Sequence, residues 1–277
     1  MTNANTRQIA EWNGAAGDSW SLNAARFDRM LAPFSDALLA AASIRPDERI
    51  LEIGCGAGGL AIAMAGRGAK VTAIDVSGSL LDVARGRASE TVDFRLGDAS
   101  HMKFPAEFGL LISHLGVMFF DDPVAAFANM RAALKPDGRL ACLAWRGPTE
   151  NEAVTLAEAA LATDLTVPVR PAGAPGPFSF GDRDRVHGIL EQSGFRDISI
   201  VPFDASMLFG EGTNQDAVLD DALVMAQHIG PLRRWLDGCD DLVTGRVLQR
   251  LRKLFADRLT PRGVELRGAA WVITAKA

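Results

Sequence analysis

The sequence predicts an α/β protein built on a doubly wound, mostly parallel sheet of seven strands. A short apolar strand at residues 50–53 runs directly into a glycine-rich turn and a helix. Strand and helix patterns then alternate up to residue 145, as they do in sheets built from right-handed crossover units. Acidic residues follow the second and third strands, at the edge where such sheets bind their ligands.

The composition fits one large domain with an elaboration. The 277 residues are 48% hydrophobic and carry a net charge of −5, and no block of lysine or arginine suggests a nucleic-acid partner. No apolar run reaches the length of a membrane span, and the polar start MTNANTRQIAEWNG is not a signal peptide. We therefore expect a cytoplasmic protein with no nucleic-acid partner and no membrane span.

The cysteines and histidines show no metal-binding or disulfide pattern. The three cysteines are scattered, and the four histidines include no H-x-H or H-x-x-x-H pair, so no metal is expected. Cys55 in the glycine turn and Cys142 in a strand pattern suit small apolar positions.

The N-terminal residues 1–45 are predicted to form a helical lid. A helical pattern covers residues 26–42, and it follows an irregular, glycine-rich stretch at residues 12–20, WNGAAGDSW. Two interpretations of this stretch stay equally open. It is either a helix pair packed permanently on the sheet or a cover over a ligand.

The glycine turn is the strongest functional signal. Residues 50–60 read ILEIGCGAGGL, with glycines where a ligand must approach the backbone closely. The spacing matches both the G-x-G-x-x-G of dinucleotide-binding proteins and the G-x-G-x-G of enzymes that bind S-adenosylmethionine (SAM). Glu52 favours SAM, because a buried carboxylate needs a partner such as an ammonium or sulfonium and would repel a pyrophosphate.

Acids at the ends of the next two strands extend this site. Asp75 lies near the carboxyl end of the strand pattern at residues 70–77, where a carboxylate can accept hydrogen bonds from ribose hydroxyls. Ser77 or Ser79 is a better cap than Asp75 for the helix that follows. Asp98, after the strand at residues 92–96, is placed for the exocyclic amine of adenine. The Ala99 amide is then expected on a ring nitrogen.

The fourth and fifth strands complete the regular pattern of residues 46–146. A strand at residues 108–113 continues into the apolar segment HLGVMFF, which starts at His114. A helix at residues 122–134 and a turn at residues 135–138, KPDG, precede the strand at residues 139–145.

The pattern changes in residues 147–277, which we assign to substrate-side helices and the closing strands of the same sheet. A loop is expected at residues 167–177, and Gly194 should end the helix at residues 182–193, which follows this loop. The last strand should insert antiparallel beside the fifth. The expected helices cover residues 151–163, 182–193, 214–229 and 242–259, and the expected strands residues 195–203 and 268–275.

Residues 45–146 resemble the class I SAM-dependent methyltransferases, in particular the small-molecule enzymes of the ubiquinone/menaquinone-biosynthesis type. The matching stretches are ILEIGCGAGGLA, VTAIDVSGSLLDVAR, FRLGDA and ALKPDGRLAC. The resemblance implies a Rossmann-like fold, SAM as cofactor with S-adenosylhomocysteine as product, and methyl transfer (EC 2.1.1.-). The ribose and adenine roles pass to Asp75 and Asp98. The full set of residues expected to bind SAM is Trp20, Glu52, Gly54, Cys55, Gly56, Asp75, Val76, Asp98, Ala99, Ser113 and His114.

The acceptor is expected to be a small, partly apolar molecule that takes the methyl group on O, N or C. No residue matches an N-P-P-[YF] motif, which argues against nucleic-acid bases. His114 is the candidate catalytic base, and His228 is a weaker one. A homodimer is one expectation for the assembly. Two alternatives stay open, namely a SAM-binding protein without methyl transfer and a NAD-dependent oxidoreductase.

Overall fold

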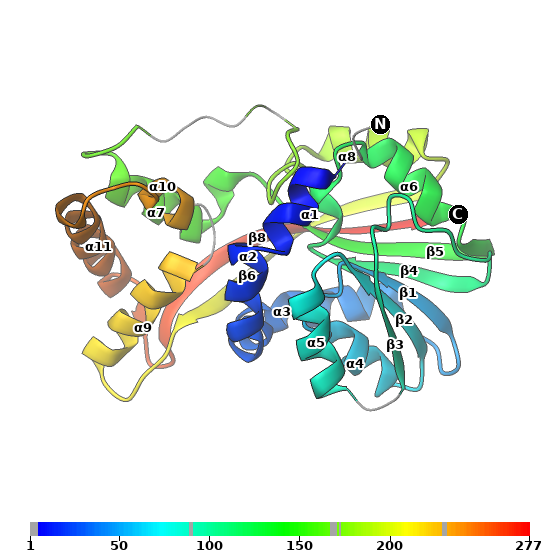
Figure 1. Ribbon diagram of the computed structural model, residues 1–277, viewed down its shortest axis with the longest axis horizontal. Coiled ribbons are helices and arrows are strands. Elements are labelled where there is room, and N and C mark those ends of the chain that lie inside the picture. The colour runs from blue at the N-terminus through cyan, green and yellow to red at the C-terminus, as the bar shows by residue number, and fades with distance from the viewer. Residues whose placement is uncertain (1–4, 89–90, 167–170, 172, 229–231) are drawn as a thin grey trace.

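A mixed sheet runs through the molecule in the computed structural model, which describes residues 5–88, 91–166, 171, 173–228 and 232–277. In this described part the sheet has eight strands, and its main path follows the order β3-β2-β1-β4-β5-β8-β6. The remaining strand, β7 (Leu259–Thr260), pairs with β8. The predicted doubly wound sheet is confirmed, with one short strand beyond the seven expected (Figure 1).

The parallel half of the sheet positions the candidate site. Strand β1 pairs with both β2 and β4, so the winding reverses between β1 and β4. The carboxyl ends of these strands meet at one edge, which is the switch point where such folds bind ligands. The parallel strands are β1 (Arg49–Ile53), β2 (Lys70–Asp75), β3 (Val92–Leu96), β4 (Phe108–His114) and β5 (Leu134–Trp145).

The prediction of a turn at residues 135–138 is wrong, because these residues lie within β5. Strand pairing with β4 jumps from Phe108–Leu134 to Leu110–Arg139, so KPDG bulges out of an otherwise continuous ladder. The proline and glycine that suggested a turn therefore accommodate an irregular strand.

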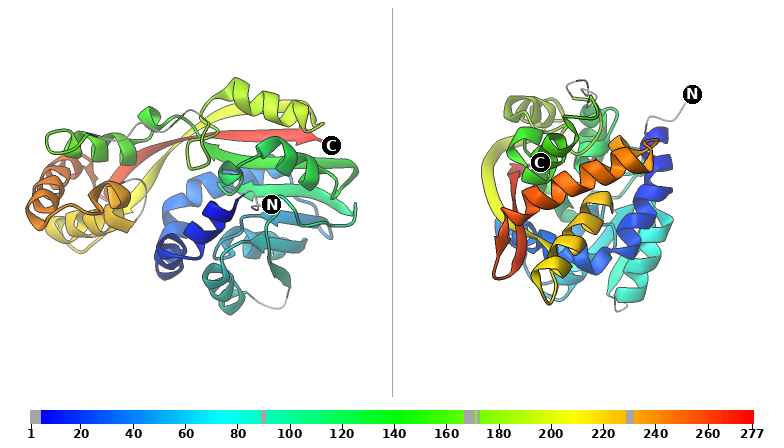
Figure 2. Two further views of the ribbon diagram at one scale, coloured as in Figure 1. Left: turned by 45° about the horizontal axis from the view of Figure 1, so that its top comes forward. Right: turned by 90° about the vertical axis from the view of Figure 1, so that its left-hand side faces the viewer.

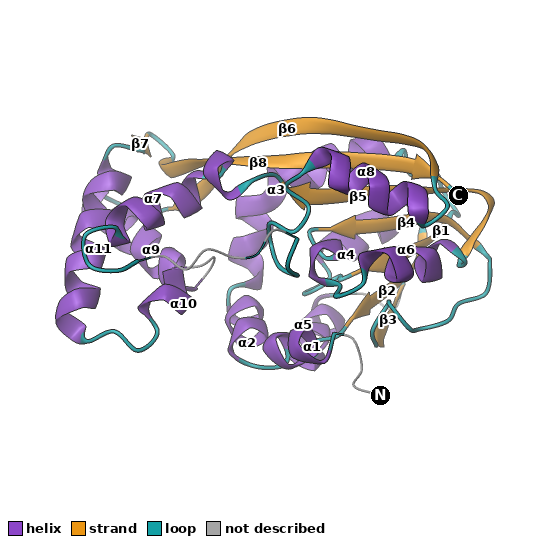
Figure 3. Ribbon diagram, turned by 90° about the horizontal axis from the view of Figure 1, so that it is seen from above, coloured by secondary structure: helices purple, strands orange, loops and turns teal. Residues whose placement is uncertain are grey.

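The last two long strands reach past the rest of the sheet (Figure 3). Strand β6 (Arg196–Gly210) pairs antiparallel with β8 (Gly263–Lys276), which also pairs antiparallel with β5. The predicted antiparallel insertion beside the fifth strand is confirmed, although both strands are longer than expected. The helices gathered at their far end are α7 (Glu152–Leu161), α9 (Gln215–His228), α10 (Leu232–Leu236) and α11 (Asp241–Ala256).

Three helices precede the sheet, namely α1 (Thr6–Trp12), α2 (Ala15–Leu22) and α3 (Ala24–Ala42). The prediction that residues 12–20 are irregular is wrong, since most of them belong to α2. A Cβ on Gly17 would lie 2.0 Å from the carbonyl oxygen of Trp12, so this glycine allows α2 to pack closely on α1. Figure 2 shows α1 and α2 between the parallel strands and the far helices.

The helices of the core agree with the sequence pattern. Ser77 caps α5, as its hydroxyl accepts a hydrogen bond from the Leu80 amide, and Gly194 ends α8 with φ +86. Within the described residues, no helix is both long and apolar enough to cross a membrane. The core helices are α4 (Gly59–Ala65), α5 (Gly78–Arg87), α6 (Pro123–Arg131) and α8 (Arg183–Gln192), with short turns η1 (Val117–Phe119) and η2 (Pro148–Glu150).

Two predicted segments fall partly outside the described residues. The loop expected at residues 167–177 is described only at residue 171 and from residue 173 onward. The helix expected to end at residue 229 is described to His228, while α10 was not predicted.

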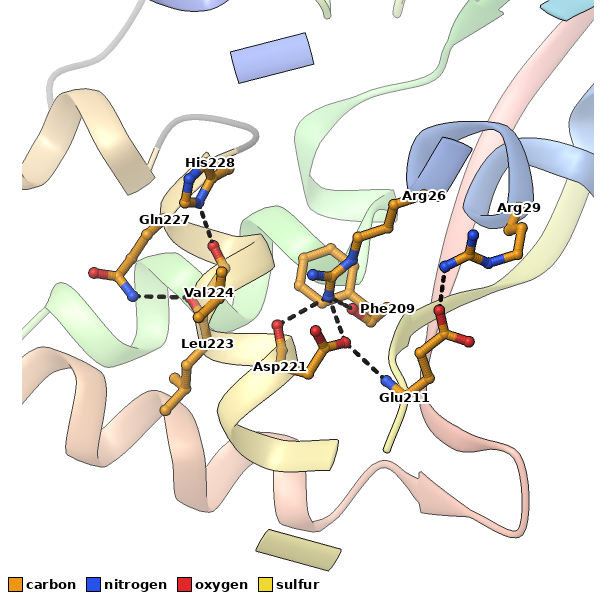
Figure 4. A network of polar contacts seen from close by, with 9 residues as sticks. All are labelled: Arg26, Arg29, Phe209, Glu211, Asp221, Leu223, Val224, Gln227 and His228. Carbon is orange, nitrogen blue, oxygen red and sulfur yellow. Dashed lines mark hydrogen bonds and ion pairs between the residues drawn. The ribbon is translucent and has the colours of Figure 1, made fainter. Parts of the chain in front are cut away.

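Arg26 of α3 ties the N-terminal helices to the far helical group (Figure 4). Its guanidinium donates to the Asp221 carboxylate at 2.6 Å and to the carbonyl oxygens of Asp221 and Phe209 at 2.9 and 3.1 Å. The Ser19 hydroxyl donates to the carbonyl oxygen of His228 at 3.1 Å. These bonds hold α9 and the end of β6 against α2 and α3.

Candidate functional site

Two glycines let the loops after β1 and β4 cross at the carboxyl edge of the sheet. Gly54 has φ +67, and a Cβ on it would lie 2.9 Å from the Cα of Gly116. A Cβ on Gly116 would in turn lie 2.8 Å from the carbonyl oxygen of Ile53. No side chain fits at this crossing, so the fold itself requires Gly54.

Gly56 instead faces open space. Its φ is +52, and no heavy atom lies within 4 Å of its Cβ position. Its N–H donates to one oxygen of Asp75 at 2.7 Å, and the Ser77 N–H donates to the other at 2.8 Å. Burial raises the pKa of Asp75, and these amide bonds oppose the shift. The acid after β2 is therefore fixed against an open glycine turn.

Glu52 is a buried carboxylate beneath this turn. It is 1% exposed, and its Oε2 has no hydrogen-bond partner among the described residues. Burial raises the pKa of Glu52 well above its ordinary value, and the nearby charge of Asp75 raises it further. Two neighbouring buried acids are costly unless a cation offsets them. The pair therefore suits a ligand that brings positive charge.

Asp98, after β3, is held by groups from two segments. It accepts hydrogen bonds from the Ser100 amide at 2.9 Å and the Ser100 hydroxyl at 2.7 Å. The Asn5 side chain donates to both of its carboxylate oxygens at 3.2 Å. Asn5 also donates its N–H to the Asp121 carboxylate at 2.7 Å and accepts from the Asp121 N–H at 2.8 Å. The residue before α1 is therefore fixed on the acid expected to bind adenine.

The other end of α1 is fastened to the loop after β2. The Asn13 side chain donates to the Val76 carbonyl oxygen at 2.8 Å and accepts from the Gly78 N–H at 3.2 Å. With Asn5 at the first end, α1 spans the ligand edge of the sheet between β3 and β2.

A large cavity opens at this edge. Its volume is about 1230 Å³, whereas pockets for one drug-sized ligand measure roughly 300–1,000 Å³. Gly56, Asp75 and Asp98 line one part of it, which leaves room for a second ligand. The apolar walls of the remainder include Met30, Leu31, Met118, Trp145, Met207 and Phe209.

His114 and Trp20 also line the cavity. His114 ends β4 with its Nε2 3.3 Å from the Ser35 hydroxyl, and burial lowers the pKa of this imidazole to about 4. It is therefore neutral at physiological pH and a weak base. The Trp20 ring stacks on Phe27 with centroids 4.0 Å apart and meets Trp12 edge-on at 5.9 Å.

The predicted binding residues divide into two groups. Trp20, Gly54, Gly56, Asp75, Val76, Asp98, Ala99 and His114 line the cavity together. Glu52, Cys55 and Ser113 lie behind its wall and do not line it. The Ser113 hydroxyl donates to the Ile53 carbonyl oxygen at 2.8 Å and accepts from the Gly116 N–H at 3.2 Å, so it braces the loop crossing. His228, the weaker base candidate, also lines the cavity.

Several lining residues escaped the sequence analysis. Asn5 is a single polar residue with no surrounding pattern, and Arg233 lies on the unpredicted helix α10. Met207 and Phe209 did carry a signal, because their alternation in SMLFG continues the strand pattern beyond residue 203.

Comparisons with known proteins point in the same direction as this geometry. Residues 51–142 match the family described as "Methyltransferase domain". An uncharacterized protein of Mycobacterium tuberculosis is 31% identical over 132 residues, which are 46% of this chain and 48% of that protein. Nocamycin O-methyltransferase of Saccharothrix syringae is 30% identical over 184 residues, which are 60% and 65% of the two chains. The chain thus spans about half the length of the first relative and just under two thirds of the second.

A solved structure agrees in fold over most of this chain. Phosphoethanolamine N-methyltransferase 2 of Haemonchus contortus, in complex with SAM, aligns with a TM-score of 0.53 and 17% sequence identity. The alignment covers 88% of this chain and 52% of that one. The strand order and the antiparallel insertion of β8 beside β5 are typical of the class I SAM-dependent methyltransferase fold. The chain therefore has the fold of class I SAM-dependent methyltransferases, and its residues 51–142 match the methyltransferase-domain family.

Proposed function

We propose that this chain is a SAM-dependent methyltransferase that acts on a small-molecule acceptor and releases S-adenosylhomocysteine. One observation carries the proposal, namely the buried, unpartnered Oε2 of Glu52 beneath an open glycine turn with Asp75 beside it. A ligand with ribose hydroxyls, an ammonium and a sulfonium complements these groups. The pyrophosphate of a nicotinamide dinucleotide would meet two acids, which disfavours the oxidoreductase alternative.

The residues at the sheet edge take separate parts of SAM in this proposal. Asp75 accepts hydrogen bonds from the ribose, with Val76 beside it. Asp98 accepts from the adenine amine, and the Ala99 amide binds a ring nitrogen. The methionine portion lies against Trp20, Gly54, Gly56 and the backbone of His114, which line the cavity. Glu52 acts on its positive charge from behind the wall, where Cys55 and Ser113 also lie.

Bound SAM supplies a methyl group on a sulfonium, and the protein has to align an acceptor with it and exclude water. The apolar walls and helix α1 suit this task. One feature supports oxygen as the acceptor atom, since one relative is named an O-methyltransferase. His114, whose pKa burial lowers to about 4, is a weak base and gives little help to an acceptor that must lose a tightly held proton. We also propose that the chain belongs to the ubiquinone/menaquinone-biosynthesis branch, because residues 45–146 resemble the enzymes of that branch.

Isothermal titration with SAM and with NAD tests the ligand, and label transfer from tritiated SAM into a metabolite extract tests the chemistry. The chain should bind SAM and not NAD. The matched variant is Gly56→Val, which puts a branched side chain at φ +52 in the open space of the turn. It should stay folded and lose SAM binding. NAD binding without SAM binding would overturn the proposal, and SAM binding without transfer would leave a binding protein.

A further inference from the structure

We propose that the methyl acceptor is an apolar organic acid whose own ionised oxygen takes the methyl group, without a base from the protein. The inference rests on the proposed function and names the substrate class of the same site. It follows from which titratable side chains face the cavity and where they lie.

The part of the cavity beyond the nucleotide-binding edge is built to hold apolar matter. Its walls come from α3, the segment after β4, the end of β5 and the extended part of β6. Met30, Met118 and Met207 are each at most 4% exposed. Methionine and aromatic side chains adapt to the shape of an apolar ligand and offer it few hydrogen bonds. The body of the acceptor is therefore apolar.

No good base faces this apolar part. The chain contains no tyrosine, and no lysine or cysteine lines the cavity in the described residues. Asp75 is bound to two amides, and Asp98 is bound to Ser100 and Asn5. His114 is held next to the Ser35 hydroxyl and stays neutral. An alcohol or a protonated amine would find no strong proton acceptor on these walls.

Two arginines of α10, Arg233 and Arg234, line the cavity and favour an anion there, although the chain as a whole is acidic. Arg234 pairs with Glu11 at 2.9 Å. Arg233 lines the cavity, is partly buried and has no carboxylate within ion-pair distance among the described residues. Arginine is the side chain best suited to a planar carboxylate.

Arg7, Glu158 and His228 are the remaining charged or titratable groups that line the cavity. Arg7 is the third arginine on the lining, and like Arg233 and Arg234 it is exposed or partly exposed. The glutamates on the lining are Glu11 and Glu158. His228 is exposed, and its Nδ1 is bonded to the Val224 carbonyl oxygen at 2.7 Å, so it belongs to the rim. Apart from Asp75 and Asp98, the lining carries three arginines and two glutamates, and this excess of positive charge would attract an anionic acceptor.

The chemistry balances without a proton transfer. A carboxylate oxygen forms a bond to the methyl carbon, the carbon–sulfur bond breaks, and its electron pair goes to sulfur. The negative charge of the acceptor and the positive charge of the sulfonium cancel, which leaves a neutral methyl ester and a neutral thioether. Because charge disappears along this path, an apolar, water-excluding cavity favours the transition state over the separated ions.

The first test measures binding of a matched pair of probes, 4-phenylbutyric acid and 4-phenylbutan-1-ol, to the protein with S-adenosylhomocysteine. The acid should bind at least about tenfold more tightly, and Arg233→Ala should remove most of that preference. Arg262→Ala is the control, because it removes an exposed arginine that does not line the cavity. Equal binding of acid and alcohol, or an acid preference that Arg233→Ala leaves unchanged, would overturn the proposal.

The second test identifies the bond that is formed. Product labelled from tritiated SAM in a metabolite extract should release volatile methanol in alkali, as methyl esters do. At saturating SAM the rate should stay flat between about pH 6 and 9, since a carboxylate is ionised throughout this range. Alkali-stable product, or a rate that climbs with pH, overturns the acid acceptor and leaves the proposed function standing. Failure to bind SAM overturns both.

Discussion

The side-chain amide of Asn5 donates to both carboxylate oxygens of Asp98, at 3.2 Å each. Asn5 is 5% exposed and also makes two hydrogen bonds to Asp121. A ligand amine that binds Asp98 has to share this carboxylate with Asn5. The position of helix α1 and the occupation of the nucleotide end of the cavity are therefore coupled.

The first prediction concerns this contact. Asn5→Ala removes the bonds to Asp98 and the side-chain bond to Asp121, each worth about 0.5–1.5 kcal/mol or somewhat more where a charge is involved. Helix α1 should then be cleaved faster by protease in the ligand-free protein. Asn23→Ala is the control, since among the described residues its side chain bonds only the nearby Ser19 carbonyl oxygen. Equal cleavage of both variants would show that Asn5 does not hold α1.

The second prediction concerns the acid after β2. Asp75→Ala should weaken SAM binding by about 1.5–3 kcal/mol, the scale of hydrogen bonds to a charged group. Titration calorimetry measures the change, and Asp82→Ala, at a position 81% exposed in its side chain, is the control. An unchanged dissociation constant with an intact fold would sink the ribose assignment.

The third prediction concerns Glu52, whose pKa is raised by burial and then by Asp75. Between the ordinary pKa and the raised one, the folded protein binds more protons than the unfolded chain. Stability from this group is therefore full at low pH and falls as pH rises through the raised pKa. Glu52→Gln should make ligand-free unfolding less pH-dependent above about pH 4.5.

The same change should weaken SAM binding, because the neutral amide no longer offsets the ligand's positive charge. Thermal unfolding across pH, with and without SAM, separates the two effects. Thr72→Val is the control, since it alters a buried polar residue on the neighbouring strand β2 without removing a charge. A pH profile identical to that of the native protein would mean that Glu52 does not titrate as argued.

The parallel half of the fold was predictable because its signals are local. Strands buried on both faces read as short apolar runs, and acids at their carboxyl ends fall at one edge by topology alone. Gly54 and Gly56 were both placed in the turn, but the sequence could not separate their roles. Only the crossing with Gly116 shows that one is required by the fold and the other faces open space.

The elements outside the parallel half were less predictable because their contacts join distant parts of the chain. Strands β6 and β8 pair with each other past the ends of the other strands, so the sequence pattern of either strand alone does not reveal its length. Gly17 looked like a break, yet it serves close helix packing that depends on the Trp12 carbonyl oxygen. The partner of Arg26 lies at Asp221, and no sequence pattern connects two such residues.

The fourth prediction concerns that connection (Figure 4). The side chains of Arg26 and Asp221 are 17% and 30% exposed, and Arg26 also serves two carbonyl oxygens. Arg26→Ala should lower the free energy of unfolding by about 1.5–3 kcal/mol, toward the lower figure because solvent screens part of the charge. Arg29→Ala is the matched control. Its pair with Glu211 is 56% and 44% exposed, so the loss should stay below about 1 kcal/mol. Similar losses in urea unfolding would contradict the assignment.

The last prediction asks whether α1 and α2 form a moving cover or a fixed part of the core. Trp20 is partly buried, stacks on Phe27 and lines the cavity, while the Asn5 and Asn13 anchors bind groups at the ligand edge. A cover held by such contacts should respond to the ligand. Trp20→Ala should therefore cost more SAM affinity than stability, and SAM should slow proteolysis of α1 and α2 in the native protein.

Trp271→Ala is the control for this comparison. Trp271 packs on Arg146 with 5.2 Å from the guanidinium carbon to the ring centroid, and it does not line the cavity. Its loss should lower the melting temperature and leave SAM affinity unchanged. A fully buried tryptophan typically costs about 3–5 kcal/mol when truncated to alanine. If Trp20→Ala costs that much stability, and SAM leaves the protease pattern unaltered, α1 and α2 belong to the core and do not open.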